Sequence, residues 1–133
     1  MARLALSDDD ARVRQWFAEE IKSLGCRLQV DQLGNMFARK AGSASAAGPM
    51  IAMGSHLDTQ PRGGRYDGIL GILAALEVLH TLQENGYTTR NDIGVVNWTK
   101  YAIHPVSGQI RVQLSRSAAK KDIVKKVLGS QDQ

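Results

Sequence analysis

The chain has 133 residues, which is enough for one domain with a sizeable buried core. Its 43% hydrophobic and 23% charged residues are ordinary for a globular protein and exclude a disordered or fibrous chain. The net charge of +4 lies entirely in the last quarter of the sequence. Residues 1–99 hold ten basic and eleven acidic residues, whereas residues 100–133 hold seven and two. Because this basic tail lacks interleaved aromatic residues and any nucleic-acid-binding motif, we expect no nucleic-acid partner.

Several features point to a cytoplasmic protein. The single cysteine, Cys26, cannot form an internal disulfide, and we expect it to be a buried structural thiol. The N-terminal stretch MARLALSDDDARVR carries acids where a signal peptide needs an apolar core. The longest apolar stretch, residues 69–82, is interrupted by glycine and polar residues and is too short to span a bilayer. We therefore predict a cytoplasmic location and no membrane partner.

The first third of the sequence predicts a helix followed by a β-hairpin. Ser7 can cap the backbone amides of a helix, and the three aspartates after it suit the positive end of the helix dipole. Apolar residues then recur at helical spacing until Gly25, which ends the helix. Residues 27–31 alternate polar and apolar, and residues 36–39 resume an extended segment after the turn at residues 33–35.

The middle of the sequence predicts a strand–helix–strand unit. Residues 50–54 form a short apolar run, which is typical of a strand buried on both faces. After a loop over residues 58–66, residues 67–83 form a helix that is apolar nearly all round and should be well buried. Residues 93–98 read as another buried strand. This order predicts an α/β fold, with a central sheet of parallel strands flanked by helices.

A candidate metal site follows the apolar run. His56 and Asp58 are two residues apart at the end of the strand, so their side chains can converge on one side of the sheet. Asp58 can accept the second imidazole N–H of His56 and fix its tautomer. Asp67 lies at the start of the next helix, past Gly63 and Gly64, which allow a tight return of the backbone. Its two carboxylate oxygens can each hold one metal ion. Imidazole and carboxylate without thiolate suit zinc, manganese or cobalt.

On spacing alone, these residues also fit simpler roles. A His-x-Asp pair is common by chance, and an aspartate before a helix is often only its N-cap. His80 shares a helical face with Glu77, as in carboxylate-bridged metal bundles, but a solvated polar stripe is the simpler interpretation. We interpret His104 as a surface residue. The sequence contains no nucleophile elbow, phosphate loop or CxxC pair.

Two long segments resemble one enzyme family. They are RLALSDDDARVRQWFAEEIKSLGCRLQVDQLGNMFARKAG and GSHLDTQPRGGRYDGILGILAALEVLHTLQENGYTTRNDIGVVNWT. Both resemble the di-zinc N-carbamoyl-L-amino-acid hydrolases, whose relatives include β-ureidopropionases and allantoate amidohydrolases, within a wider group of aminoacylases and zinc exopeptidases. Covering about residues 3–99, the resemblance implies the N-terminal part of a zinc-exopeptidase-like catalytic domain that hydrolyses carbon–nitrogen bonds of small linear amides.

The resemblance implies a role for each candidate residue. His56 corresponds to the histidine that binds one zinc ion, and Asp67 to the aspartate that bridges both zinc ions. Asp58 corresponds to the catalytic-site carboxylate that supports this histidine. In the family, a metal-activated water attacks the amide or carbamoyl carbon, and a glutamate acts as general base.

The resemblance stops after Thr99. The family continues from Asn-Trp-Thr into Asn-Glu-Glu-Gly, which supplies the base and a zinc ligand, but here Lys100-Tyr101-Ala102 follows. Two later ligand histidines and the dimerisation domain of the family are also missing from the sequence. We therefore expect residues 1–99 to be a truncated part of the catalytic domain, inactive alone and weak in metal binding. Residues 100–133 would be a basic tail foreign to the family.

The tail allows two hypotheses. Lys-Tyr-Ala can be encoded by AAG TAC GCN, which also reads as an exon ending in AA before a GT donor site, so the tail can be translated intron or another splice or frame error. Alternatively the chain is a non-catalytic, partner-binding module. Residues 109–114 alternate as a strand does, and residues 123–128 place an apolar face beside lysines that can contact the sheet or an acidic surface.

Overall fold

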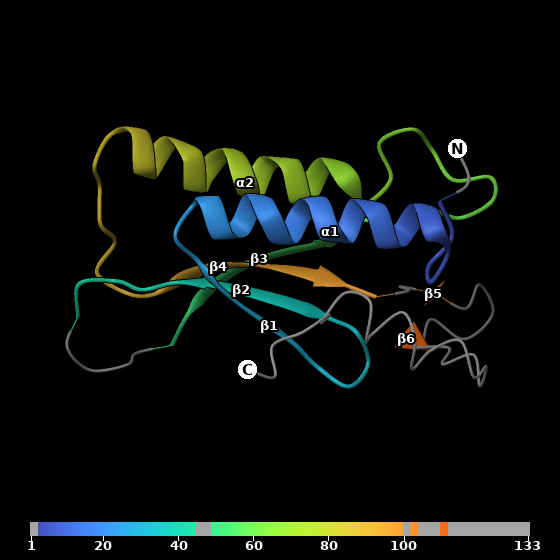
Figure 1. Cartoon of the computed structure of the whole chain (residues 1–133), viewed down its shortest axis with the longest axis horizontal. Coiled ribbons are helices and arrows are strands. Elements are labelled where there is room, and N and C mark those ends of the chain that lie inside the picture. The colour runs from blue at the N-terminus through green and yellow to red at the C-terminus, as the bar shows by residue number, and fades with distance from the viewer. Residues whose placement is uncertain (1–2, 45–48, 100–101, 104–109, 112–133) are drawn as a thin grey trace.

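The structure is a computed structural model of the whole chain and describes residues 3–44, 49–99, 102–103 and 110–111. In these residues a four-stranded sheet carries two helices on one of its faces (Figure 1). The elements are α1 (Asp8–Ser23), β1 (Arg27–Val30), β2 (Met36–Lys40), β3 (Ile51–His56), α2 (Ile69–Glu84), β4 (Ile93–Trp98), β5 (Ala102–Ile103) and β6 (Ile110–Arg111). β5 and β6 pair antiparallel in a separate two-stranded sheet.

Helix α1 begins and ends as its sequence predicts. The Ser7 hydroxyl accepts a hydrogen bond from the amide of Asp10 at 3.2 Å, which satisfies one free donor of the first turn. Gly25, with a φ of 72°, follows the last turn in the left-handed region. Phe17, Ile21 and Leu24 face the sheet and are at most 1% exposed. The adjoining Cys26 is also buried, as predicted.

The predicted hairpin is present as β1 and β2. The two strands pair antiparallel, with Val30 opposite Met36 at the closed end. In the turn, the Asp31 carboxylate accepts hydrogen bonds from the amides of Leu33 and Asn35 at 2.9 and 2.8 Å. Gly34 adopts a φ of 84°, which costs other residues free energy. An aspartate and a glycine at the turn therefore fix the register of the pair.

The α/β class is confirmed, but the sheet is mixed rather than parallel. Its strand order is β1-β2-β4-β3. β3 and β4 are parallel because they are joined through α2, which is the predicted strand–helix–strand unit. β2 pairs antiparallel with β4, and β1 pairs antiparallel with β2. The hairpin thus extends the unit on the side of β4 away from β3.

The prediction that β3 is buried on both faces is wrong. β3 is the edge strand of the four-stranded sheet, and Ile51 is 60% exposed. A continuous apolar run is typical of a central strand, but within the described residues β3 has a hydrogen-bonded neighbour only on the β4 side.

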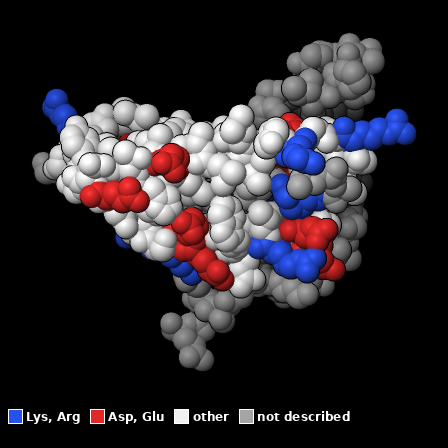
Figure 2. All heavy atoms as spheres, turned by 90° about the horizontal axis from the view of Figure 1, so that it is seen from above, with Lys and Arg blue, Asp and Glu red and all other residues white. Residues whose placement is uncertain are grey.

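The prediction that α2 is well buried is only half right. Ile72, Ala75, Leu76 and Leu79 belong to the core, whereas Leu70 is 63% exposed. Figure 2 looks down on the helical layer and shows a broad uncharged area there. An all-round apolar helix can bury all its faces only between two layers, and the described residues supply one.

Three further sequence predictions meet the structure here. His80 lies in α2 and its Nε2 is 2.8 Å from Oε1 of Glu20 in α1, so it joins the two helices rather than only facing solvent. Among the residues that the structure describes, no helix is long and apolar enough to cross a membrane. His104, the predicted helix at 123–128 and most of the predicted strand at 109–114 lie outside the described residues.

Candidate metal centre

The three candidate residues lie around one end of β3. His56 is the last residue of β3, opposite Trp98 of the parallel neighbour β4. Residues 57–68 then lead to α2, and Asp67 lies two residues before the helix. His56 and Asp67 are therefore brought together at the carboxyl end of a parallel strand pair, where open α/β sheets place their sites.

His56 presents a different nitrogen to each of the two aspartates. Its Nδ1 is 2.8 Å from the main-chain carbonyl oxygen of Asp58, whereas its Nε2 is 3.7 Å from Oδ1 of Asp67. With the Nδ1–H donating to that carbonyl, Nε2 carries its lone pair toward Asp67. This tautomer is the one that a metal ion between Nε2 and Asp67 requires.

The Asp58 side chain lies beside the imidazole without forming a close hydrogen bond to it. Its Oδ1 is 3.5 Å from Nδ1 of His56, and the carboxylate is 12% exposed. The Asp58 side chain raises the pKa of His56, its carbonyl and the charge of Asp67 add to that effect, and burial of the ring opposes it. The sequence predicts that this carboxylate accepts the imidazole N–H; in the structure the carbonyl of the same residue accepts it.

Asp67 is not the side-chain N-cap of α2. The N-cap residue is Gly68, and no side chain caps the first turn. The Asp67 side chain is 41% exposed and directs Oδ1 toward His56. A helix-capping role therefore does not account for the position of this aspartate.

Gly68 is a site residue that the sequence interpretation missed. It has a φ of 74°, and a Cβ atom there would lie 2.3 Å from the carbonyl oxygen of His56 and 2.5 Å from ring atoms of the same residue. Its carbonyl accepts a hydrogen bond from the Ser55 hydroxyl at 2.7 Å. The signal in the sequence is an Asp-Gly pair at a loop–helix junction, whereas the tight return was expected at Gly63 and Gly64. Gly63 is closely packed against Gln60, but Gly64 has open space around it.

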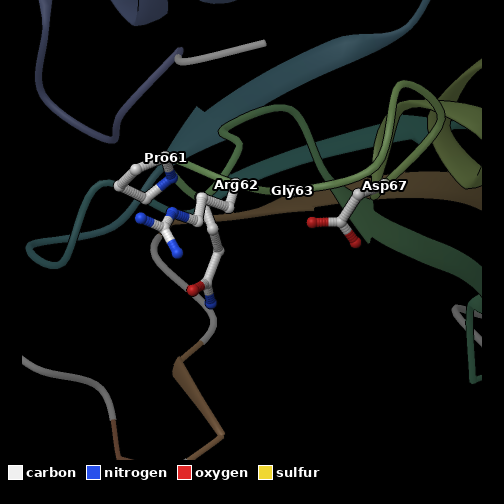
Figure 3. Close-up of a pocket in the computed structure, with 5 residues that line it drawn as sticks. Pro61, Arg62, Gly63 and Asp67 are labelled. Atoms are coloured by element: carbon white, nitrogen blue, oxygen red, sulfur yellow. The ribbon is translucent and has the colours of Figure 1, made fainter.

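A shallow open pocket adjoins Asp67. It has a volume of about 560 Å³ and is lined by Gln60, Pro61, Arg62, Gly63 and Asp67. Figure 3 shows the Asp67 carboxylate on one side of it, with Pro61 and Arg62 on the other. A small polar molecule could reach the carboxylate through this opening.

Two ligand atoms fit a metal ion, and a complete ligand set is not present. Nitrogen and oxygen ligands lie about 2.0–2.2 Å from zinc, so two ligands of one ion can be at most about 4.4 Å apart. The 3.7 Å between Nε2 of His56 and Oδ1 of Asp67 is within that limit. Among the described residues, however, no group of three or more histidine, cysteine, aspartate or glutamate side chains is placed to hold a metal ion.

Comparisons with known proteins agree on one family. No protein-family profile matches the chain. The chain is 41% identical over 97 residues to an N-carbamoyl-L-amino-acid amidohydrolase of Rhizobium meliloti, covering 73% of this chain and 23% of the relative. It is 34% identical over 99 residues to a ureidoglycolate hydrolase of Oryza sativa, covering 74% of this chain and 20% of the relative.

A solved structure gives the same result. A hydantoinase/carbamoylase family amidase from Burkholderia ambifaria superposes with a TM-score of 0.70 at 48% identity, covering 74% of this chain and 24% of that one. The chain thus spans only about a quarter of the length of these relatives. Over about three quarters of its own length, the chain belongs to the hydantoinase/carbamoylase family of amidohydrolases, of which it carries part of the catalytic domain.

Proposed function

We propose that this chain carries one half of the binuclear metal site of a hydrolase acting on carbon–nitrogen bonds. His56 would be the terminal ligand of one ion through Nε2, Asp67 would bridge two ions, and Asp58 would hold the imidazole. The observation that supports this most is the division of labour on His56: Nδ1 bonds to residue 58 while Nε2 faces the Asp67 carboxylate at 3.7 Å.

The donor types suit zinc, and also manganese or cobalt. When bound, such ions would lower the pKa of a coordinated water and polarise the carbonyl of an amide. The residues of this chain would orient the ligands: Asp58 keeps the proton of His56 on Nδ1, and Gly68 lets the loop pass close to the imidazole. The open pocket beside Asp67 would admit the substrate.

The substrate class we propose is a small linear amide such as an N-carbamoyl amino acid. Its support is the set of names of the relatives, which are amidohydrolases of N-carbamoyl-L-amino acids and ureidoglycolate hydrolases. The 133 residues by themselves would not turn such a substrate over. The sequence has Lys100-Tyr101-Ala102 where the resemblance implies two glutamates, so a general base and a third ligand are missing from this segment.

An assay of the purified chain tests this proposal. With N-carbamoyl amino acids and added zinc or manganese, we expect no hydrolysis above the background without protein. His80→Ala is the matched control for His56→Ala, because His80 pairs with Glu20 away from the site. Turnover that is abolished by His56→Ala and kept in His80→Ala would contradict the predicted inactivity of the chain.

A further inference from the structure

The segment before α1 clamps the loop that carries Asp58. The amide of Arg3 donates to Oγ1 of Thr59 at 2.7 Å, and the amide of Thr59 donates back to the carbonyl of Arg3 at 2.7 Å. The Arg3 side chain donates from Nε to the carbonyl of Leu57, also at 2.7 Å. Residues on both sides of Asp58 are therefore fixed by one arginine that is more than fifty positions away in sequence.

The far side of the same loop is held by β4. The amide of Leu57 donates to Oδ1 of the fully buried Asn97 at 3.0 Å. Leu57 itself is 0% exposed and belongs to the core. With Arg3 on one side and Asn97 on the other, the peptide groups next to Asp58 have little freedom to move.

A buried charged pair in α1 lies close to this clamp. Asp10 is 0% exposed and Arg14, one turn later, is 5% exposed. Burial raises the pKa of Asp10, with the charge of Asp58 acting in the same direction, while the bond from Leu6 and the charges of Arg14 and Arg3 oppose it. Two carboxylates and two guanidinium groups therefore form one compact, charge-balanced cluster behind His56.

The backbone between the clamp and α1 is strained. Leu6 has a φ of 69°, the one positive value found for a non-glycine residue among those described. In this conformation its amide donates to Oδ2 of Asp10 at 2.9 Å. A branched residue in the left-handed region costs about 1–3 kcal/mol, so the surrounding contacts must hold it there.

Three side-chain atoms of the cluster are buried with no hydrogen-bond partner among the described residues: Nη2 of Arg3, Oδ1 of Asp10 and Oδ1 of Asp58. One is a donor and two are acceptors, so their needs are complementary. Removing one charge from such a cluster leaves an opposite charge buried and uncompensated, which displaces its neighbours.

We propose that Arg3, supported by the buried Asp10 and Arg14, is a positioning residue for the metal centre. It holds the loop so that the Asp58 carbonyl keeps the proton of His56 on Nδ1 and leaves Nε2 for a metal ion. This inference rests on the proposed function. The competing possibility is that Arg3 only fastens the start of the chain to the core, in which case its loss lowers stability without affecting His56.

The test uses the whole chain and compares Arg3→Ala with Arg12→Ala. Arg12 is an arginine of α1 whose side chain is 77% exposed, so it is the matched control. Long-range nitrogen–proton NMR spectra of the imidazoles report which ring nitrogen of His56 carries the proton, and zinc titration of the same samples gives the affinity. Urea unfolding of each variant measures stability separately.

We expect Arg3→Ala to mix the two tautomers of His56 and to weaken zinc binding about 10- to 100-fold, as loss of an outer-shell partner typically does. Arg12→Ala should change neither quantity. Unchanged His56 spectra and unchanged affinity in a folded Arg3→Ala protein would overturn the inference. If Arg3→Ala does not fold, Thr59→Val replaces it, since that change removes only the hydroxyl that accepts from Arg3.

The two proposals fail in different ways. If the wild-type chain binds no zinc at His56, the proposed function fails, but the tautomer of His56 still decides the positioning role. A tautomer that shifts in Arg3→Ala and not in Arg12→Ala supports it, and a tautomer common to all three proteins overturns it.

Discussion

The two helices of this protein have 16 residues each and lie on the same face of the sheet, yet their sequences and their burial do not match. α1 is the more polar, with three acids in its first turn, but its apolar residues Phe17 and Ile21 are completely buried. α2 is apolar nearly all round, but Leu70 and Leu73 are 63% and 44% exposed. Apolar content thus measures how much a helix could bury, while the number of faces that have partners decides how much it does bury.

The same contrast applies to the site. His56 and Asp67 come from the β3–α2 side, which is the exposed side of the molecule, whereas the residues that fix their loop come from the well-packed α1 and β4. The predictions below, from the largest expected effect to the smallest, test whether the two sides differ in energy as they do in burial.

The largest effect is expected at Phe17. Its ring is 0% exposed in the core between α1 and the sheet. Phe17→Ala should lower the free energy of unfolding by about 3–5 kcal/mol, since a buried phenylalanine truncated to alanine loses its transfer free energy and leaves a cavity. Urea denaturation measures the change, and a loss below about 1 kcal/mol would show that α1 is not part of the core.

Gly68→Ala should have the next largest effect. Both its positive φ and the 2.3 Å approach of a Cβ to the His56 carbonyl oppose a side chain there. We expect a loss of at least ~2 kcal/mol in stability and displacement of His56. Gly86→Ala is the matched control, because Gly86 has a φ of 61° with nothing within 4 Å, so only the ~1 kcal/mol backbone cost should appear. Equal losses in the two variants would contradict the close packing of Gly68 on His56.

A smaller, pH-dependent effect is expected at Asp92. This carboxylate accepts a hydrogen bond from the amide of Gly42 at 2.8 Å and pairs with Arg39, and both contacts lower its pKa below the ordinary 3.8. A lowered carboxyl pKa stabilises the folded state above the unfolded pKa, and this stabilisation is lost as the pH falls through the folded pKa. The Tm of Asp92→Asn should therefore lie below that of the wild type at pH 7, and the two should converge below about pH 4. Glu77→Gln, on the exposed side of α2, is the control; a pH-independent difference for Asp92→Asn would refute the ion-pair explanation.

The smallest effect is expected at Leu70. Leu70→Ala should change the free energy of unfolding by no more than about 0.5 kcal/mol, because most of the side chain is already in water. A loss comparable to that of Phe17→Ala would mean that this face of α2 is covered in solution.

The sequence predicted what depends on local chemistry. The Ser7 cap, the hairpin turn at Gly34 and the crossover from residues 50–54 through α2 to residues 93–98 all follow from residues close together in the chain. It did not predict the exposure of Ile51 and Leu70, because an apolar pattern does not state how many neighbouring layers exist.

The site could be predicted only in part for the same reason. His56, Asp58 and Asp67 are close in sequence, and the strand-end geometry brings His56 and Asp67 within reach of each other. Arg3, Asp10 and Asn97 reach this loop from distant positions, and no spacing in the sequence links them to it. The involvement of Gly68 depends on the packing of one Cβ position against the imidazole, which only the three-dimensional structure shows.

A zinc titration of the wild-type chain by calorimetry tests the central claim, that this chain carries half of a metal site, most directly. We predict binding with a Kd weaker than about 1 μM, because two protein ligands are fewer than the three or four of established sites. The binding should be lost in His56→Ala and kept in His80→Ala. Submicromolar binding, or binding that His56→Ala leaves unchanged, would contradict the account.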